Sequence, residues 1–177
     1  MATKPTIHKA RIALTDLDRN HYESLDLTVA LHPSETTERM CARIVAYCIN
    51  AAEGITFTTG ISTRDEPDIQ LTSLDNRMLA WIDVGEPSPD RLKKASRLAE
   101  RVRVYSFNSK SDVWWNKTRP KLNTLGVVEV FQMPWAQIQA ASALVKRTMD
   151  WSMMISEGAA FVTADNGDCE VAWRLLG

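Results

Sequence analysis

The sequence lacks the features that mark membrane, secreted and nucleotide-dependent proteins. No apolar run approaches the roughly 20 residues of a membrane span, and the N-terminus lacks the charged-then-apolar layout of a signal peptide. No Walker A or GxGxxG sequence is present to hold a nucleotide phosphate. The three histidines are widely spaced and match no zinc-ligand pattern. We therefore expect a cytoplasmic protein with no membrane segment, no zinc site and no nucleotide cofactor.

Cysteine and net charge are also low. The chain has three cysteines and no CxxC motif, which argues against a disulfide framework and favours a reducing compartment. Cys41 and Cys48 share one face of a helical pattern, so we predict that both are small buried residues. The net charge is −1 and the pI is about 6.3, so no overall basic field attracts nucleic acid, although a local patch could still bind it.

What the sequence does contain is a regular succession of predicted strands and helices. Residues 78–85 are apolar on both faces, as in a central strand. Further strands are predicted at 103–107 and 127–131, helices near residues 34–54, 88–100, 112–115 and 134–145, and hairpins over 8–31 and 150–176. The 177 residues suit one domain, residues 1–177. We predict an α/β or α+β fold, a central mixed β-sheet flanked by helices, with added hairpins.

The main candidate for chemistry is an acidic cluster formed by Asp65-Glu66-Pro67-Asp68 and Asp83. Asp68 precedes the central strand and Asp83 lies near its end, so a hairpin or a bent strand pair could bring the two together. Mg²⁺ is typically held by one or two carboxylates with water and phosphate, and a bound metal can activate water. The alternative is a turn of solvated acids without a metal.

Two helices supply further candidates. Ser34 is predicted to cap the first helix and Gly54 to end it, and a helical wheel then places Glu38 at the edge of the buried stripe and Glu35 toward solvent. On the helix after Pro89, one flank near the apolar arc carries two cations that could lean over Asp83 or lie on the surface. They are Arg91 and Lys94.

The aromatic pair Trp114-Trp115 is a candidate surface for nucleic acid. Trp115 could stack on a base, although such a pair more often puts one ring in the core and one at its rim. A modest basic patch around the pair could contact phosphates. Its members are Lys110, Lys117, Arg119 and Lys121.

Seven segments resemble a known family when they are taken together. They are SETTERM (34–40), FTTGIS (57–62), DEPD (65–68), WIDVG (81–85), RLKKA (91–95), VY (104–105) and WW (114–115). Their order over nearly the whole chain resembles the YaeQ family of small bacterial proteins. The resemblance implies a variant PD-(D/E)xK nuclease-like fold with a restriction-endonuclease-like core.

In that superfamily a Pro-Asp begins the motif, and an Asp or Glu two residues before a Lys completes it. Asp68 matches the first acid, Asp83 matches the second, and Gly85 occupies the position of the lysine. The resemblance implies that Lys94 could supply the missing cation from the following helix, with Arg91 as second choice. Asp83 also departs from the glutamate that is common in the family.

The resemblance implies a Mg²⁺ or Mn²⁺ site and, as the leading hypothesis, metal-dependent hydrolysis of nucleic-acid phosphodiesters. The metal ligands would be Asp68, Asp83 and Glu38, the catalytic cation Lys94, and the substrate contacts Arg91 and Trp115. Glu38 enters this set because it matches an acid on the first helix of such nucleases. The rival hypothesis is a non-catalytic protein that binds nucleic acid or another protein, favoured by Gly85 and the near-neutral charge. The sequence specifies neither a particular protein partner nor an oligomeric state.

Overall fold

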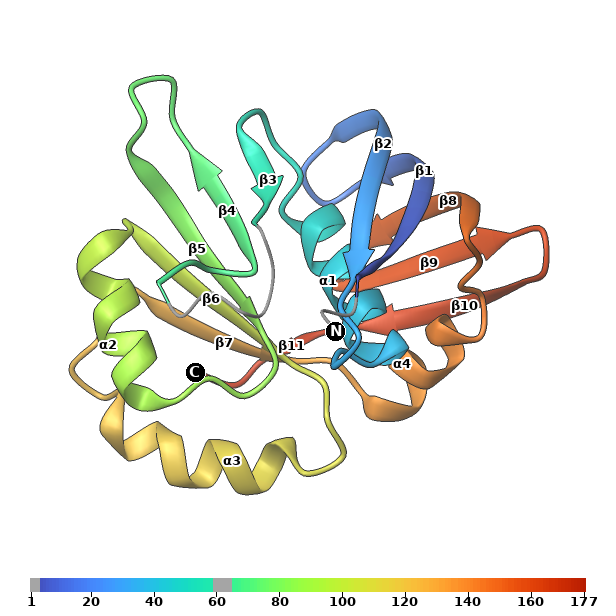
Figure 1. The fold of residues 1–177 in the computed structure, drawn as a ribbon. Helices are drawn as coiled ribbons and strands as arrows, with labels where there is room; N and C mark the ends of the chain where they lie inside the picture. Colours follow the sequence, from blue (N-terminus) through green and yellow to red (C-terminus); the bar gives the residue numbers. More distant parts are fainter. Residues whose placement is uncertain (1–3, 59–64) are drawn as a thin grey trace.

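Two β-sheets with four helices form the described part of this computed structural model, residues 4–58 and 65–177 (Figure 1). The first sheet has the strand order β10-β9-β8-β1-β2. Its strands are β1 (Thr6–Asp16), β2 (His21–Leu31), β8 (Thr148–Ser156), β9 (Ala159–Ala164) and β10 (Gly167–Ala172). Buried and exposed residues alternate along β1, β2 and β8, which is the pattern of strands with one face in a core.

The predicted terminal hairpins are present, but they do not extend the central sheet. β1 pairs antiparallel with β2 and parallel with β8, so the two ends of the chain meet in a sheet of their own. Ile12, for example, lies opposite Trp151, and both are buried. A parallel pairing between such distant segments leaves no local turn signal, because no hairpin connects the strands.

The second sheet carries the candidate site. Its strand order is β11-β7-β6-β5-β4-β3, and β5, β6 and β7 are parallel. Its strands are β3 (Ile55–Phe57), β4 (Ile69–Thr72), β5 (Met78–Val84), β6 (Arg101–Ser106), β7 (Val128–Gln132) and β11 (Arg174–Leu175). On β5, Trp81 and Ile82 are both completely buried although they point to opposite faces, which confirms the central strand predicted from the apolar run.

Helix α1 (Thr37–Ile49) lies between the two sheets and joins them in one core (Figure 1). Every residue from 40 to 49 is buried, and Cys41 and Cys48 are completely so, as predicted. The predicted helix ends were wrong. Thr36, not Ser34, is the N-cap, where its side chain accepts the Arg39 N–H, and the helix stops at Ile49, ahead of Gly54. The cap is therefore two residues later than predicted, so Ser34 and Glu35 lie in the turn before the helix and not in its first turn.

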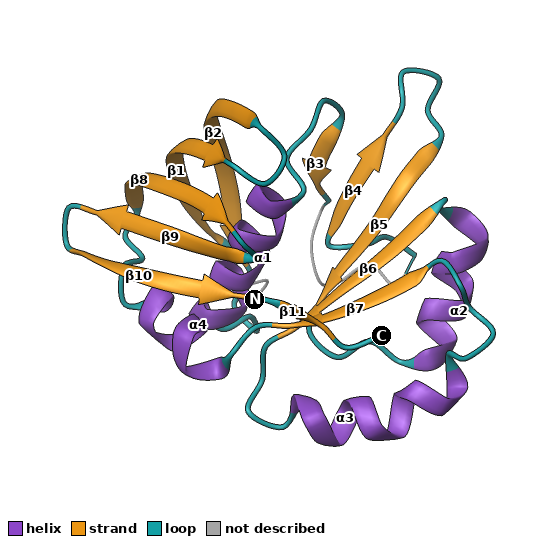
Figure 2. Cartoon of the chain, turned by 180° about the vertical axis from the view of Figure 1, so that it is seen from behind, coloured by secondary structure: helices purple, strands orange, loops and turns teal. Residues whose placement is uncertain are grey.

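The other helices lie in two places, two of them on the outer face of the second sheet and one beside α1 (Figure 2). α2 (Pro89–Leu98) and α3 (Ser111–Thr118) pack on the face of the second sheet opposite α1, around the buried Trp81, and a short 3₁₀ turn, η1 (Arg119–Lys121), follows α3. α4 (Trp135–Ser142) packs against α1 and β10. Within residues 4–58 and 65–177, the helices are all too short or too polar to cross a membrane.

Candidate functional site

Asp68 and Asp83 meet where β4 begins and β5 ends. The antiparallel register pairs Ile69 with Ile82, and each aspartate lies one residue beyond this pair, so the two face each other across the strands. Asp68 is 8% exposed and Asp83 is 2% exposed. Burial of two carboxylates is costly unless each finds a partner, so the partners decide what this site can do.

Asp68 is held by one arginine and one backbone amide. The Arg39 Nη2 donates to Oδ1 at 2.7 Å, and the Val84 N–H donates to Oδ2 at 2.8 Å. The same Arg39 nitrogen also donates to the Val84 carbonyl oxygen at 3.2 Å. Arg39 thus ties α1 to the hairpin of β4 and β5.

Asp83 is held by Arg91 in a two-point contact. The Arg91 Nε donates to Oδ2 at 2.8 Å and the Nη2 donates to Oδ1 at 3.1 Å, while Nη2 also donates to the Glu66 carbonyl oxygen at 2.6 Å. The guanidinium carbon lies 5.2 Å from the centre of the Trp81 ring, within reach of a cation–π interaction. Arg91 therefore ties α2 to the same hairpin.

The environment raises the pKa of Asp83. Burial is the main cause and the neighbouring charge of Asp68 adds to it, while the hydrogen bond and charge of Arg91 lower the pKa. Trp81 is also close enough to lower this pKa, yet its buried indole N–H lacks a hydrogen-bond partner in the described part of the chain. The Trp81 indole therefore lies close to the Asp83 carboxylate without donating a hydrogen bond to it.

A second ion-pair cluster adjoins Arg39. The carboxylate of Glu35 is only 1% exposed and accepts hydrogen bonds from Arg39 and from two nitrogens of Arg43. The sequence prediction that Glu35 faces solvent was wrong. The helical wheel does not apply to Glu35, because α1 begins at Thr37 and Glu35 lies in the turn before the cap.

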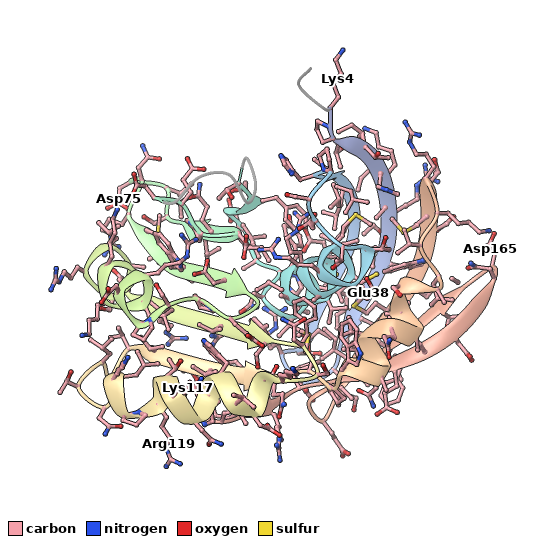
Figure 3. The ribbon with its side chains drawn as sticks, turned by 60° about the horizontal axis from the view of Figure 1, so that its bottom comes forward. Lys4, Glu38, Asp75, Lys117, Arg119 and Asp165 are labelled. Atoms are coloured by element: carbon pink, nitrogen blue, oxygen red, sulfur yellow. The ribbon has the colours of Figure 1, made fainter. Side chains whose placement is uncertain are left out.

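Glu38 is not part of this cluster. Burial raises the pKa of Cys41, and the nearby Cys169 of β10 and then Glu38 add smaller contributions. Glu38 therefore lies on the side of α1 that faces α4 and the first sheet (Figure 3). Arg39, about 100° further round the helix, is the residue that reaches Asp68.

Lys94 also lies outside the buried cluster. It forms an exposed ion pair with Asp65, at the start of the acidic segment. Arg91 is in the first turn of α2 and reaches Asp83, whereas Lys94 lies almost one turn further along the helix. Arg91, the second choice in the sequence analysis, is therefore the cation that contacts Asp83, and Lys94, the first choice, is not.

Gly85, two residues after Asp83, has a φ of 121°. L-residues with a side chain rarely adopt this conformation, so a lysine at this position would strain the backbone. The Gly85 N–H donates to the Tyr105 carbonyl oxygen at 2.9 Å, which holds the turn in place. The local backbone accounts for a glycine here.

Asp68 and Asp83 each form an ion pair with one arginine, so their two negative charges are matched by two positive charges. All four carboxylate oxygens accept a hydrogen bond, three from guanidinium groups and one from an amide. In the described ranges, no three His, Cys, Asp or Glu residues are grouped so that they could hold a metal ion. A metal at this place would compete with the two arginines and the Val84 N–H for the same carboxylate oxygens.

The aromatic pair lies nearby on α3. Trp114 and Trp115 are both half-buried, with ring centres 6.1 Å apart, so the expected division into one core ring and one rim ring is not seen. The Trp114 Nε1 donates to the Pro87 carbonyl oxygen at 3.1 Å, which ties α3 to the loop that follows β5. Trp115 lines a separate cavity between α3 and β7.

The fold and the site define a mixed α+β protein in which a buried cluster of aspartates and arginines joins one hairpin to two helices. The family model described as YaeQ protein matches residues 1–173, and the chain belongs to the YaeQ family.

Its relatives include the uncharacterized protein YaeQ of Escherichia coli (strain K12), 35% identical over 98% of both chains, and that of Salmonella typhi, with the same identity and coverage. The crystal structure of YaeQ protein from Pseudomonas syringae is 41% identical with a TM-score of 0.93, covering 98% of this chain and 96% of that one. The YaeQ protein structure from Xanthomonas axonopodis pv. citri is 28% identical with a TM-score of 0.93, covering 97% and 98%.

Proposed function

We propose that this protein binds nucleic acid on a nuclease-like fold without a resident catalytic metal. The observation that carries the proposal is the pairing of two of the three candidate metal ligands, Asp68 with Arg39 and Asp83 with Arg91. Mg²⁺ requires several oxygen ligands, and here the oxygens already accept hydrogen bonds from groups that balance their charge. The cluster then serves to fix the hairpin to α1 and α2 rather than to activate water.

A cationic segment at the end of α3 and in η1 supports nucleic acid as the partner. Residues 113–128 contain no Asp or Glu, and they contain Lys117, Arg119 and Lys121. All three cations are exposed, and none has an ion-pair partner within the described ranges. Figure 3 shows Lys117 and Arg119 on the surface of the molecule. Unpaired lysines and arginines gathered on one surface are the groups that contact a phosphate backbone and release its counterions.

Binding and cleavage should be measured in the same samples. Labelled single-stranded and double-stranded DNA and RNA are titrated with the protein in EDTA, with anisotropy as the readout, and then incubated with Mg²⁺ or Mn²⁺ and resolved on a gel. We expect binding that persists in EDTA and weakens as salt rises, with intact oligonucleotides throughout. Absence of binding to all four at low salt, or divalent-dependent products that disappear in Asp83→Asn, would overturn the proposal.

A metal-dependent phosphodiesterase is the second candidate, favoured by the juxtaposition of Asp68 and Asp83. In that function the two carboxylates would hold Mg²⁺ or Mn²⁺, and the metal would supply activated water. Calorimetric titration of Mn²⁺ into wild type, Asp68→Asn and Asp165→Asn separates the two proposals. Asp165 is a matched control because it is an exposed acid at the far side of the molecule (Figure 3). Binding that is lost only in Asp68→Asn supports the metal site, and equal, negligible heats in all three support metal-free binding.

We also propose a cytoplasmic location. Its support is that Cys41, Cys48 and Cys169 are free thiols, two of them buried, as suits a reducing compartment. Labelling the intact cell with a thiol reagent that does not cross membranes should leave the protein unmodified.

A further inference from the structure

A cavity of about 370 Å³ lies between α3, the loop after η1, and β7. Its apolar lining includes Leu122 and Val130, both buried, and its polar lining includes Arg119 and Asn123, both exposed. Trp115 forms part of the wall. The volume falls within the roughly 300–1,000 Å³ that is typical of sites for small molecules.

The walls of this cavity have the chemistry of a base-binding site. Trp115 is half-buried and packs against the core around Trp81, so its ring is anchored while part of it is accessible. An anchored aromatic face can stack on any base, and a neighbouring amide such as that of Asn123 can donate to or accept from a base edge. At Gly126 an added Cβ atom would meet no neighbouring atom within 4 Å, so the space beside this glycine is open.

The charges around the opening are suited to a polyanion. Arg119 is one of the lining residues, and Lys117 and Lys121 flank it on the same acid-free segment. Gly177, the last residue of the sequence, also lines the cavity, and its oxygen accepts the Val130 N–H at 2.9 Å, which directs that oxygen toward β7. Among the side chains that line the cavity, that of Arg119 is charged and the others are neutral.

We infer that this cavity receives one base of a single-stranded nucleic acid, which stacks on Trp115 while the flanking phosphates contact Lys117, Arg119 and Lys121. The inference rests on the proposed function and names its substrate class and its contact surface. Single strands are specified because a base inside a duplex is stacked on its neighbours and reaches a protein pocket only after it is extruded.

The test uses short oligonucleotides that carry one 2-aminopurine, whose fluorescence falls when it stacks. Single-stranded DNA, single-stranded RNA and the matching duplex are titrated with the full chain. We expect quenching with single strands and little with the duplex. Trp115→Ala should weaken binding about 5- to 150-fold, the range reported by alanine substitution of stacking aromatics, and remove the quenching. Trp115→Phe, which keeps a stacking face, should restore part of both.

Two further variants separate the cavity from the charge. Gly126→Leu fills open space without deleting any group, so weaker binding by this variant would support insertion of a base. Replacing Lys117, Arg119 and Lys121 together by Gln should lower the slope of log affinity against log salt by about two, since each single-strand phosphate contact contributes about 0.7.

Matched controls come from the same chain. Tyr22→Ala removes an aromatic ring that is 61% exposed on the β1–β2 hairpin, and Arg97→Gln removes an exposed cation on α2. Both should bind as wild type does. If wild type binds none of the oligonucleotides, the proposed function itself has failed. If wild type binds without quenching, or Trp115→Ala and Gly126→Leu bind as tightly as wild type, this inference fails while the proposed function stands.

Discussion

Replacing Arg91 by Gln should reveal what the ion pairs at the centre of the site contribute. The substitution removes both hydrogen bonds to Asp83 and leaves a carboxylate that is 2% exposed without its counter-charge. Removing one partner of a buried pair typically costs about 3–5 kcal/mol. The Arg91 side chain is 25% exposed, so we expect the lower end, about 3 kcal/mol at neutral pH, or roughly 6–12 °C in Tm for a chain of this size.

The loss should depend on pH in a specific direction. The pKa of Asp83 is raised in the folded protein, chiefly by burial, so the folded state binds more protons than the unfolded state between the two pKa values. Such a group contributes most stability at low pH and loses that contribution as pH rises through its folded pKa. Arg91 opposes this rise in pKa, so its removal raises the pKa further, and the loss of stability should be larger at about pH 8 than at about pH 5.

Urea unfolding followed by circular dichroism at both pH values measures this effect. Arg97→Gln, an exposed substitution on the same helix, is the control and should change stability by less than about 0.5 kcal/mol. Adding Asp83→Asn to Arg91→Gln removes the unpaired charge and should recover at least about 1 kcal/mol and flatten the pH dependence. An equal loss at both pH values, or no recovery in the double variant, would refute the reasoning.

Three more predictions concern α1 and the thiols. Glu35→Gln removes the carboxylate between two arginines, and urea unfolding should show a loss of about 3–5 kcal/mol, whereas a loss below about 1 kcal/mol would contradict its burial. Thr36→Ala removes the N-cap and should cost about 1 kcal/mol by the same assay, with Thr36→Ser close to wild type. A colorimetric thiol reagent should modify only Cys169 in the native protein, because Cys41 and Cys48 are completely buried whereas Cys169 is half-buried. Burial raises the pKa of all three thiols, and that of Cys41 to about 12, so rapid reaction of all three would show that α1 is not packed as described.

Local sequence patterns correctly predicted those structural features whose contacts join residues that are near one another in the chain. The hairpin predicted over residues 8–31 and the apolar run of β5 each reflect interactions within a few residues, and the structure confirms both. The meeting of Asp68 and Asp83 belongs to this group as well, because a short hairpin joins the two strands. The order of residues along the chain was therefore enough to predict that these two side chains could meet.

The sequence by itself determined a mixed fold of the α/β or α+β class, the central strand and the terminal hairpins, and it indicated that Asp68 and Asp83 could meet. The tertiary structure decided what surrounds those carboxylates: Arg39 from α1 rather than Glu38, and Arg91 rather than Lys94. It also decided that the two ends of the chain form a sheet of their own. The physical reason is the same in each case. The side of a helix that faces a given strand depends on where the helix begins and on how it packs between two sheets, and the pairing of distant strands depends on which apolar faces are left to bury.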